Sequence, residues 1–139
     1  MEDSIFTKIV KGEIPCHKVY EDSKTIAFIP LHPIALGHVL VVPKLQVEFF
    51  YDLPTKDAHA LMDSVQKVGK RMKDVLRTNR VGLKVVGLDV NHVHFHVVAF
   101  DTLDEYNQNE DMSAQPDQTI LATMAKKLAF WDPGSNVLP

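Results

Sequence analysis

Cysteine is almost absent from this sequence, since Cys16 is the only one among 139 residues. One thiol cannot form an internal disulfide. Long apolar runs are missing as well, and none approaches the length of about 20 residues that a membrane-spanning helix needs. The first residues, Met-Glu-Asp-Ser-Ile-Phe, lack the basic and then apolar pattern of a secretory signal. We therefore expect a cytoplasmic protein with no membrane partner.

An excess of basic charge is missing too, because the formal net charge is −3. A protein that attracts nucleic acid through its overall field needs positive charge, so we expect no nucleic-acid partner. Any phosphate must be bound locally, by a few histidines, lysines and backbone amides. Hydrophobic residues make up 45% and charged residues 24%, as in an ordinary soluble globular protein. The length suits one domain with a core, and we assign residues 1–139 to it.

The order of the predicted helices and strands indicates an α+β fold. The elements are a helix over 4–10, strands over 18–20, 25–29 and 39–42, a long helix capped by Thr55 with an apolar stripe to 75–76, strands over 81–86 and 90–100, and a helix over 117–130. The core covers about 4–100, and the acidic segment 101–116 is expected to be flexible. The all-apolar strand 39–42 belongs near the middle of the sheet. We predict an antiparallel sheet of about five strands, with the long helix and the C-terminal helix packed on it.

Three histidines alternate with apolar residues in the stretch from Asn91 to Phe100. A period of two is that of a β-strand, so His92, His94 and His96 share one face while the apolar residues between them line the other. Imidazole titrates near neutral pH and can act as a nucleophile, a general acid or base, or a metal ligand. The pattern therefore predicts a chemical site, to which His38 on another strand could add a fourth imidazole.

Two other interpretations of the histidines remain open. Surface histidines on an edge strand could fall at this spacing by chance, although three in alternation make chance a poor explanation. A zinc site is the sharper rival, because His-x-His on a strand supplies two workable ligands. No carboxylate or thiol is obviously arranged with the histidines to complete a zinc set, and Cys16 is the only cysteine.

The run His92-Val93-His94-Phe95-His96-Val97-Val98 resembles the signature of the histidine triad (HIT) superfamily of nucleotide hydrolases and transferases. Two further stretches resemble the same family in the expected order. They are the amino-terminal segment from Ser4 to Pro15 and the strand Leu36-Gly37-His38-Val39-Leu40-Val41-Val42-Pro43-Lys44. The resemblance spans roughly residues 4–100, and three matching parts in order are more specific than the triad alone.

The resemblance implies a catalytic role for each histidine. His94 is then the nucleophile that forms a covalent nucleotidyl-histidine, and His96 lies near the α-phosphate and the leaving group. His92 and His38 belong to the hydrogen-bonded network around them. Substrate contacts are implied for Phe6, Ile9, Phe28, Leu31, Lys84 and Asp89, of which Phe6 and Ile9 line a pocket for the nucleobase. The implied substrate is a nucleoside monophosphate with a leaving group on the α-phosphate, such as a phosphoramidate or a dinucleoside polyphosphate.

The resemblance also bears on cofactors and partners. Bacterial relatives often carry a zinc site built with cysteines near the amino terminus. This chain has Ser4 and Thr7 there, so no such metal and no other cofactor is expected. Relatives are often homodimers paired through a helix and a strand, and a homodimer is expected here as well.

The chain departs from the family pattern at two places. Pro30 stands where the family has a ribose-binding aspartate, and proline has neither a side-chain acceptor nor an N–H. The loop 87–91 is shorter than usual and has Leu88 at the position of a polar residue, while Lys84 could partly replace the lost donors. These departures leave open an alternative function, a catalytically weak nucleotide-binding or partner-binding module.

Overall fold

Five antiparallel strands form one sheet in the computed structural model, which describes residues 2–135 and 137. The order of the strands in the sheet is β1-β2-β3-β5-β4. Their bounds are β1 His17–Glu21, β2 Thr25–Ile29, β3 His38–Pro43, β4 Arg80–Lys84 and β5 Phe95–Phe100. The predicted α+β class and the hairpin of the first two strands are confirmed.

Strand β3 occupies the middle of the sheet, as its apolar sequence predicts. All six of its residues are buried, because β2 and β5 flank it and both of its faces are covered. In the β3–β5 register His38 lies opposite Val98, and Leu40 lies opposite His96. His38 and His96 are therefore diagonal neighbours on one face of the sheet, within reach of each other.

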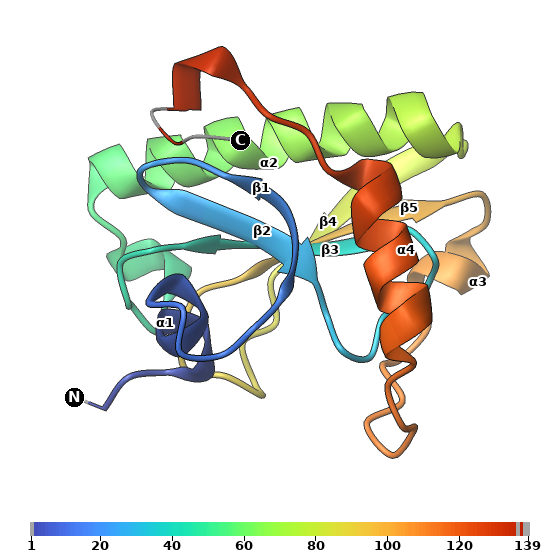
Figure 1. Ribbon diagram of the computed structural model, residues 1–139, viewed down its shortest axis with the longest axis horizontal. Helices are drawn as coiled ribbons and strands as arrows, with labels where there is room; N and C mark the ends of the chain where they lie inside the picture. The colour runs from blue at the N-terminus through green and yellow to red at the C-terminus, as the bar shows by residue number, and fades with distance from the viewer. Residues whose placement is uncertain (1, 136, 138–139) are drawn as a thin grey trace.

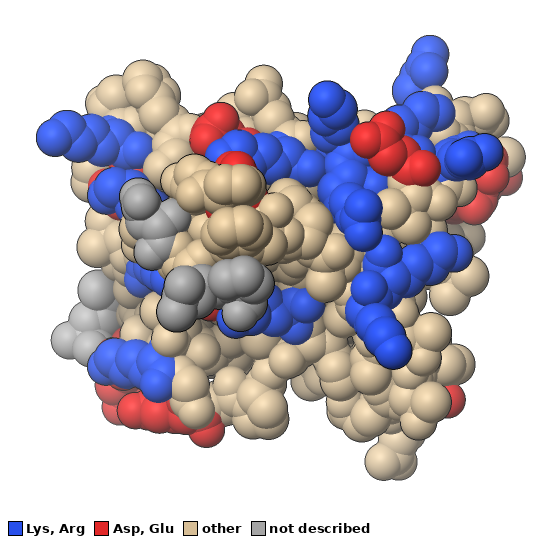
Figure 2. All heavy atoms as spheres, turned by 45° about the horizontal axis from the view of Figure 1, so that its top comes forward, with Lys and Arg blue, Asp and Glu red and all other residues tan. Residues whose placement is uncertain are grey.

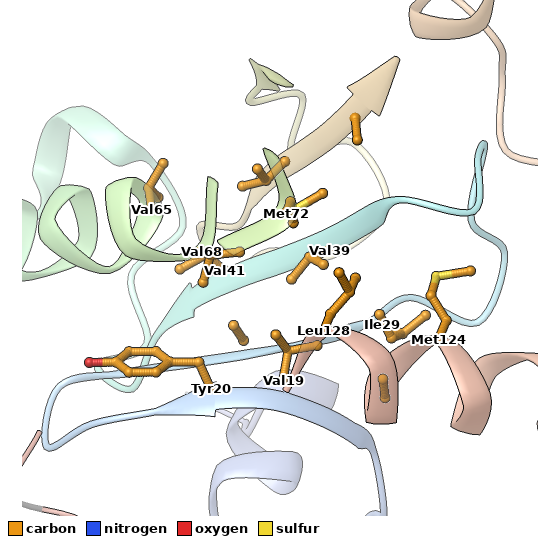
Figure 3. Close-up of a cluster of buried hydrophobic side chains, with 14 of the residues drawn as sticks. Val19, Tyr20, Ile29, Val39, Val41, Val65, Val68, Met72, Met124 and Leu128 are labelled. Carbon is orange, nitrogen blue, oxygen red and sulfur yellow. The ribbon is translucent and has the colours of Figure 1, made fainter. Parts of the chain in front are cut away.

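Helices cover both faces of the sheet (Figure 1). The helices are α1 Ile5–Val10, α2 Thr55–Leu76, α3 Leu103–Tyr106 and α4 Gln118–Leu128, with short 3-10 turns at Phe50–Asp52 and Pro133–Ser135. Helices α2 and α4 pack on one face and form the larger core with alternate residues of the strands, among them Val39, Val41, Val68, Met72 and Leu128 (Figure 3). On the other face, Phe6 of α1 packs with Phe28 and Leu40. No helix among residues 2–135 and 137 is both long and apolar enough to cross a membrane.

The strand that carries the triad is shorter than predicted. β5 begins at Phe95, so only His96 lies in it, and His92 and His94 precede it in a bend and an extended stretch. The alternation persists beyond the strand, because Val93 belongs to the larger core while His94 lies against Phe6 on the other side. The predicted face is right, but the strand boundary is wrong.

The helices also differ from the prediction in three places. The long helix begins at Thr55 with Pro54 in the cap position, so Thr55 is its first residue rather than its cap. The C-terminal helix has the predicted cap, Asp117, but ends at Leu128 rather than at 130. Within 101–116 the structure contains α3, which was not predicted and whose N-terminus is capped by a capping box between Thr102 and Glu105.

Candidate active site

Four buried histidines come together where β3 and the stretch before β5 lie side by side. His38, His92, His94 and His96 are each between 0 and 7% exposed. The ring centroids of His94 and His96 are 5.1 Å apart, and those of His38 and His96 are 5.2 Å apart. These four residues were predicted to form one catalytic group, and all four lie together in the structure.

Both ring nitrogens of His92 are occupied by the protein. Its Nε2–H donates to the carbonyl of Pro43 at 2.8 Å, so its Nδ1 accepts, and the hydroxyl of Ser4 donates to Nδ1 at 2.6 Å. Burial lowers the pKa of His92. His92 is therefore a neutral, fixed group, and its backbone carbonyl is held in place for the next histidine.

The surroundings of His92 are a hydrogen-bonded network rather than a zinc site. Gln46 Oε1 accepts from the backbone amide of Ser4 at 2.8 Å and from the hydroxyl of Thr7 at 2.6 Å. Zinc prefers thiolate, imidazole and carboxylate ligands. Two hydroxyls and an amide beside one imidazole whose nitrogens are both engaged do not fit that ion.

His94 presents a free nitrogen to the site. Its Nδ1–H donates to the carbonyl of His92 at 2.7 Å, which leaves the lone pair on Nε2. The side chain is fully buried, and Nε2 has no hydrogen-bond partner among the described residues. The carboxylate of Asp89 is 3.2 Å from Nε2 but is not aligned for a hydrogen bond. A buried nitrogen with a free lone pair is the arrangement that a nucleophile needs.

A backbone amide fixes the proton on His96 through His38. The amide of Ile34 donates to His38 Nδ1 at 3.0 Å, so the proton of His38 is on Nε2. That Nε2–H donates to His96 Nδ1 at 2.9 Å, so the proton of His96 is on its own Nε2. Burial, helped by neighbouring positive charges, lowers the pKa of His38 to about 3 and that of His96 to about 4. His96 is thus a neutral N–H donor beside His94.

Two cavities lie at the site, and the smaller of them is lined by two of the four histidines. The larger, of about 510 Å³, is mainly apolar and includes five of the six predicted substrate-binding residues: Phe6, Ile9, Phe28, Leu31 and Asp89. The smaller, of about 340 Å³, includes His38, His96, Lys84 and Asp89. Lys84 lines it, but its ammonium already donates to the carbonyl of Tyr106. All six predicted residues therefore line one cavity or the other.

Glu110, which was not predicted as a site residue, lines both cavities. It comes from the acidic segment 101–116, where no spacing or motif distinguishes it from its neighbours. Pro30 lines the larger cavity and offers no acceptor there, while His32 lies nearby on the same wall. The carboxylates of Glu110 and Asp89 thus reach the cavities from other parts of the chain.

A metal could also be considered at His38, His96 and Glu110, whose ligand-type atoms lie within 4.8 Å of one another. The two imidazole nitrogens that face each other there already share a hydrogen bond. A bound ion would have to break that bond and change the tautomer of His38, whose Nδ1 already accepts from the amide of Ile34. The geometry therefore favours a hydrogen-bonded pair of histidines over metal binding at this position.

Comparison with known proteins identifies relatives along most of the chain. The family model of the HIT domain matches residues 11–103. An uncharacterized HIT-like protein of Methanocaldococcus jannaschii is 38% identical over 101 residues, which cover 68% of this chain and 76% of that protein. An adenosine 5'-monophosphoramidase of Schizosaccharomyces pombe is 36% identical over 98 residues, which cover 68% of this chain and 71% of that enzyme.

A solved structure has the same architecture. The crystal structure of a HIT-like protein from Bartonella henselae, described as involved in cell-cycle regulation, matches with a TM-score of 0.79 at 29% identity. The match covers 91% of this chain and 93% of the other. The structural match therefore extends beyond residues 11–103, the part of the chain matched by the family model.

Proposed function

The chain belongs to the histidine triad (HIT) family, and from this premise we propose that it is a nucleotide hydrolase or nucleotidyl transferase that acts at an α-phosphate. The observation that carries the proposal is the buried Nε2 of His94, which has a free lone pair and no hydrogen-bond partner among the described residues. The substrate is a nucleoside monophosphate with a leaving group on phosphorus, of the phosphoramidate or dinucleoside polyphosphate type. The phosphoramidase relative supports the first of these types.

In the first step His94 Nε2 attacks the α-phosphorus. A phosphorus–nitrogen bond forms to the histidine as the bond from phosphorus to the leaving group breaks. The Nε2–H of His96 donates a hydrogen bond to the departing nitrogen or oxygen, which takes a proton from solvent and leaves as a neutral amine or a protonated phosphate. His96 keeps its single proton and stays neutral, because its Nδ1 continues to accept from His38.

In the second step water attacks the nucleotidyl-histidine. The water oxygen bonds to phosphorus and releases a proton to solvent, while the bond between phosphorus and His94 Nε2 breaks. The Nε2–H of His96 donates to a phosphate oxygen and stabilises its charge. The products are a nucleoside monophosphate and the restored histidines. In a transfer reaction another acceptor replaces water.

The larger cavity is the proposed place of the nucleobase. Its walls are mainly apolar, with Phe6 and Phe28 at a ring-centroid distance of 5.6 Å. Flat apolar walls suit a planar base. Phe6 also has its ring 5.0 Å from that of His94, so a base against Phe6 brings its phosphate toward the nucleophile.

Intact-protein mass spectrometry tests the proposal. Wild type and His96→Ala are mixed with adenosine 5'-phosphoramidate or a diadenosine polyphosphate. Loss of the hydrogen-bond donor at His96 should let the covalent state accumulate, which adds the mass of a nucleotidyl group. The adduct should vanish when His94 is also replaced by Ala, while His59→Ala, a change at an exposed histidine of α2, should leave the reaction as in the wild type.

The alternative is a catalytically weak module that binds a nucleotide or a protein partner. It is motivated by Pro30, which removes a ribose acceptor while the four histidines persist. Nucleotide affinity measured by calorimetry beside turnover separates the two functions. Tight binding without an adduct or product across the same substrates would favour the module. Activity that needs an added divalent metal and is lost in a chelator would instead favour a metal-dependent enzyme.

We also propose that the protein acts as a homodimer. β4 is an edge strand, since only β5 pairs with it in the described sheet. Leu83 in this strand and Val85 and Val86 just after it are exposed. An unpaired strand edge with apolar side chains is a ready pairing surface.

A further inference from the structure

Two carboxylates face the histidines that would carry out the reaction. Asp89 Oδ1 is 3.2 Å from His94 Nε2, and Glu110 Oε1 is 3.7 Å from His96 Nδ1. The Glu110 side chain is only 24% exposed, and that of Asp89 is 49% exposed. Both residues line both cavities. Negative charge at this point is unexpected in a site for phosphate, because it repels the substrate that the histidines attract.

An independent observation points to a ligand beside Asp89 and His94. His94 Nε2 is fully buried and lacks a hydrogen-bond partner among residues 2–135 and 137, and Asp89, 3.2 Å from it, lines both cavities. A buried polar atom without a partner is costly unless a ligand satisfies it. A reacting group at Nε2 therefore lies close to Asp89, and its leaving group has room in a cavity that Glu110 also lines.

Lys84, the lysine in the wall of the smaller cavity, does not neutralise this pair. The Lys84 ammonium donates to the carbonyl of Tyr106 and lies over the Tyr106 ring at 4.4 Å from its centroid. These contacts hold it against the segment that carries Glu110. Two carboxylates and one engaged ammonium leave the wall of the smaller cavity with an excess of negative charge.

Glu110 is held in place by the elements on either side of it. Tyr106 packs against Phe100 with ring centroids 4.8 Å apart, and its hydroxyl donates to the carbonyl of Leu83. On the other side, Asp117 caps α4 through the amides of Thr119 and Ile120. Both ends of the segment are thus attached to the folded domain, and Glu110 is directed into the site rather than into solvent.

We infer that Glu110, together with Asp89, selects substrates by the charge of the leaving group, favouring a cationic amine and disfavouring a polyphosphate. This inference rests on the proposed function, because it concerns the same site. The α-phosphate is common to all the substrates, so its repulsion cancels in a comparison. The leaving groups differ in charge, so the two carboxylates attract a protonated amine and repel a polyphosphate. Discrimination by an unfavourable charge is an effective source of specificity.

Three adenosine 5'-phosphoramidates of equal chain length test the inference. Their amines are 1,3-diaminopropane, propylamine and β-alanine, which give a cationic, a neutral and an anionic leaving group on the same nucleotide. Diadenosine triphosphate serves as the polyphosphate. The kcat/KM of each is measured for wild type, Glu110→Gln and the matched control Asp104→Asn, which removes an exposed carboxylate from the same segment.

The wild type should prefer the diaminopropane amide over the β-alanine amide by about tenfold or more at low salt. In Glu110→Gln the ratio should fall to about threefold or less, while Asp104→Asn should keep the ratio of the wild type. Added salt should reduce the ratio in the wild type, because screening weakens the interaction between charges.

Other results would overturn the inference. If Glu110→Gln lowers kcat/KM by the same factor for all substrates, Glu110 contacts a part that they share, such as the sugar, and charge selection is wrong. Diadenosine triphosphate as the best wild-type substrate would also contradict it. If no substrate is turned over and no adduct forms on His94, the proposed function fails and the inference fails with it. An adduct with equal rates for all three amides would overturn the inference alone.

Discussion

At the scale of residues, the site is determined by which nitrogen of each imidazole carries a proton. Hydrogen bonds to backbone groups fix these protons. The amide of Ile34 fixes the tautomer of His38 and, through it, that of His96, and the carbonyl of His92 fixes the tautomer of His94. Each assignment starts from a group that can only donate or only accept, so the chain of tautomers has one solution. The reactive nitrogen of His94 and the donor of His96 follow from the fold itself.

Burial of the histidines predicts a pH dependence of stability. The folded pKa of His38 is about 3 and that of His96 is about 4, below the usual 6.5, and the pKa of His92 is lowered too. Between pH 6.5 and 5 the unfolded chain takes up protons at these histidines that the folded chain does not. Their stabilisation is therefore fully present above pH 6.5, and the free energy of unfolding should fall by about 1.4 kcal/mol per pH unit for each proton as pH drops below it.

Urea unfolding at pH 7.5, 6.5, 5.75 and 5 measures this slope. Depressed carboxyl groups such as Asp22 and Glu21 lose their stabilisation only at lower pH, near their ordinary pKa values of about 4, so they contribute little in this window. Replacing His38 by Asn should reduce the slope, whereas replacing the exposed His59 by Asn should leave it unchanged. A wild-type stability that is constant from pH 6.5 to 5 would contradict the neutral, buried state of these histidines.

The sequence predicts the residues of the site better than their interactions. Alternation of His92, His94 and His96 was enough to put them on one face. Their hydrogen-bond partners cannot be predicted from spacing, because the hydrogen bond between Ser4 and His92 joins residues 88 positions apart. Glu110 was missed for the same reason, since its place beside His96 depends on how the segment after β5 folds back.

At the scale of elements, the close approach of β3 to α2 and β5 predicts the effect of a substitution at Gly37. A Cβ at this position would lie 2.5 Å from Leu76 Cδ1 and 2.8 Å from Ala99 Cβ. Gly37→Ala should therefore lower the free energy of unfolding by about 1–3 kcal/mol, as overpacking does in a dense core. Because His38 follows at once, the change should also lower turnover.

Gly69 is the matched control, and it should give the opposite sign. It lies inside α2, and the nearest atom to its added Cβ, Val81 Cγ1, is 3.8 Å away. Gly69→Ala should raise the free energy of unfolding by up to about 1 kcal/mol, because alanine is the better helix former. Urea or thermal unfolding of both variants measures the difference. Equal stability of Gly37→Ala and the wild type would mean that the core at β3 relaxes more easily than its packing indicates.

The errors in the elements have local causes. The triad pattern continues through His92 and His94, but these residues have no ladder partner on β3, so the strand starts at Phe95. Helix α3 was missed because it is a single turn in a polar stretch, although Thr102 and Glu105 have the spacing of a capping box. The periodicity of apolar residues indicates long helices and strands well, but it does not reveal a helix of a single turn.

At the scale of the whole molecule, positive charge gathers on one face without making it a binding surface. Figure 2 shows lysine and arginine side chains over the region where α2 is exposed. Several of these charges already have partners, since Lys67 pairs with Asp63 at 3.2 Å and with Asp132 at 2.6 Å. With a net charge of −3, this face is better explained as a solvated helix surface than as a site for nucleic acid.

The free edge of β4 predicts the oligomeric state. Leu83 and Val86 are 42% and 57% exposed, and a second copy could pair with this edge and cover them. Sedimentation equilibrium should therefore give twice the chain mass of 15.7 kDa. Leu83→Lys should return the protein to one chain mass, because a charge on an edge strand opposes pairing.

The control Ile120→Lys changes a similarly exposed apolar residue, 50% exposed on α4, and this variant should stay dimeric. A wild type that sediments as a single chain at its highest soluble concentration would rule out the dimer, and a dimer that survives Leu83→Lys but not Ile120→Lys would move the interface from β4 to α4.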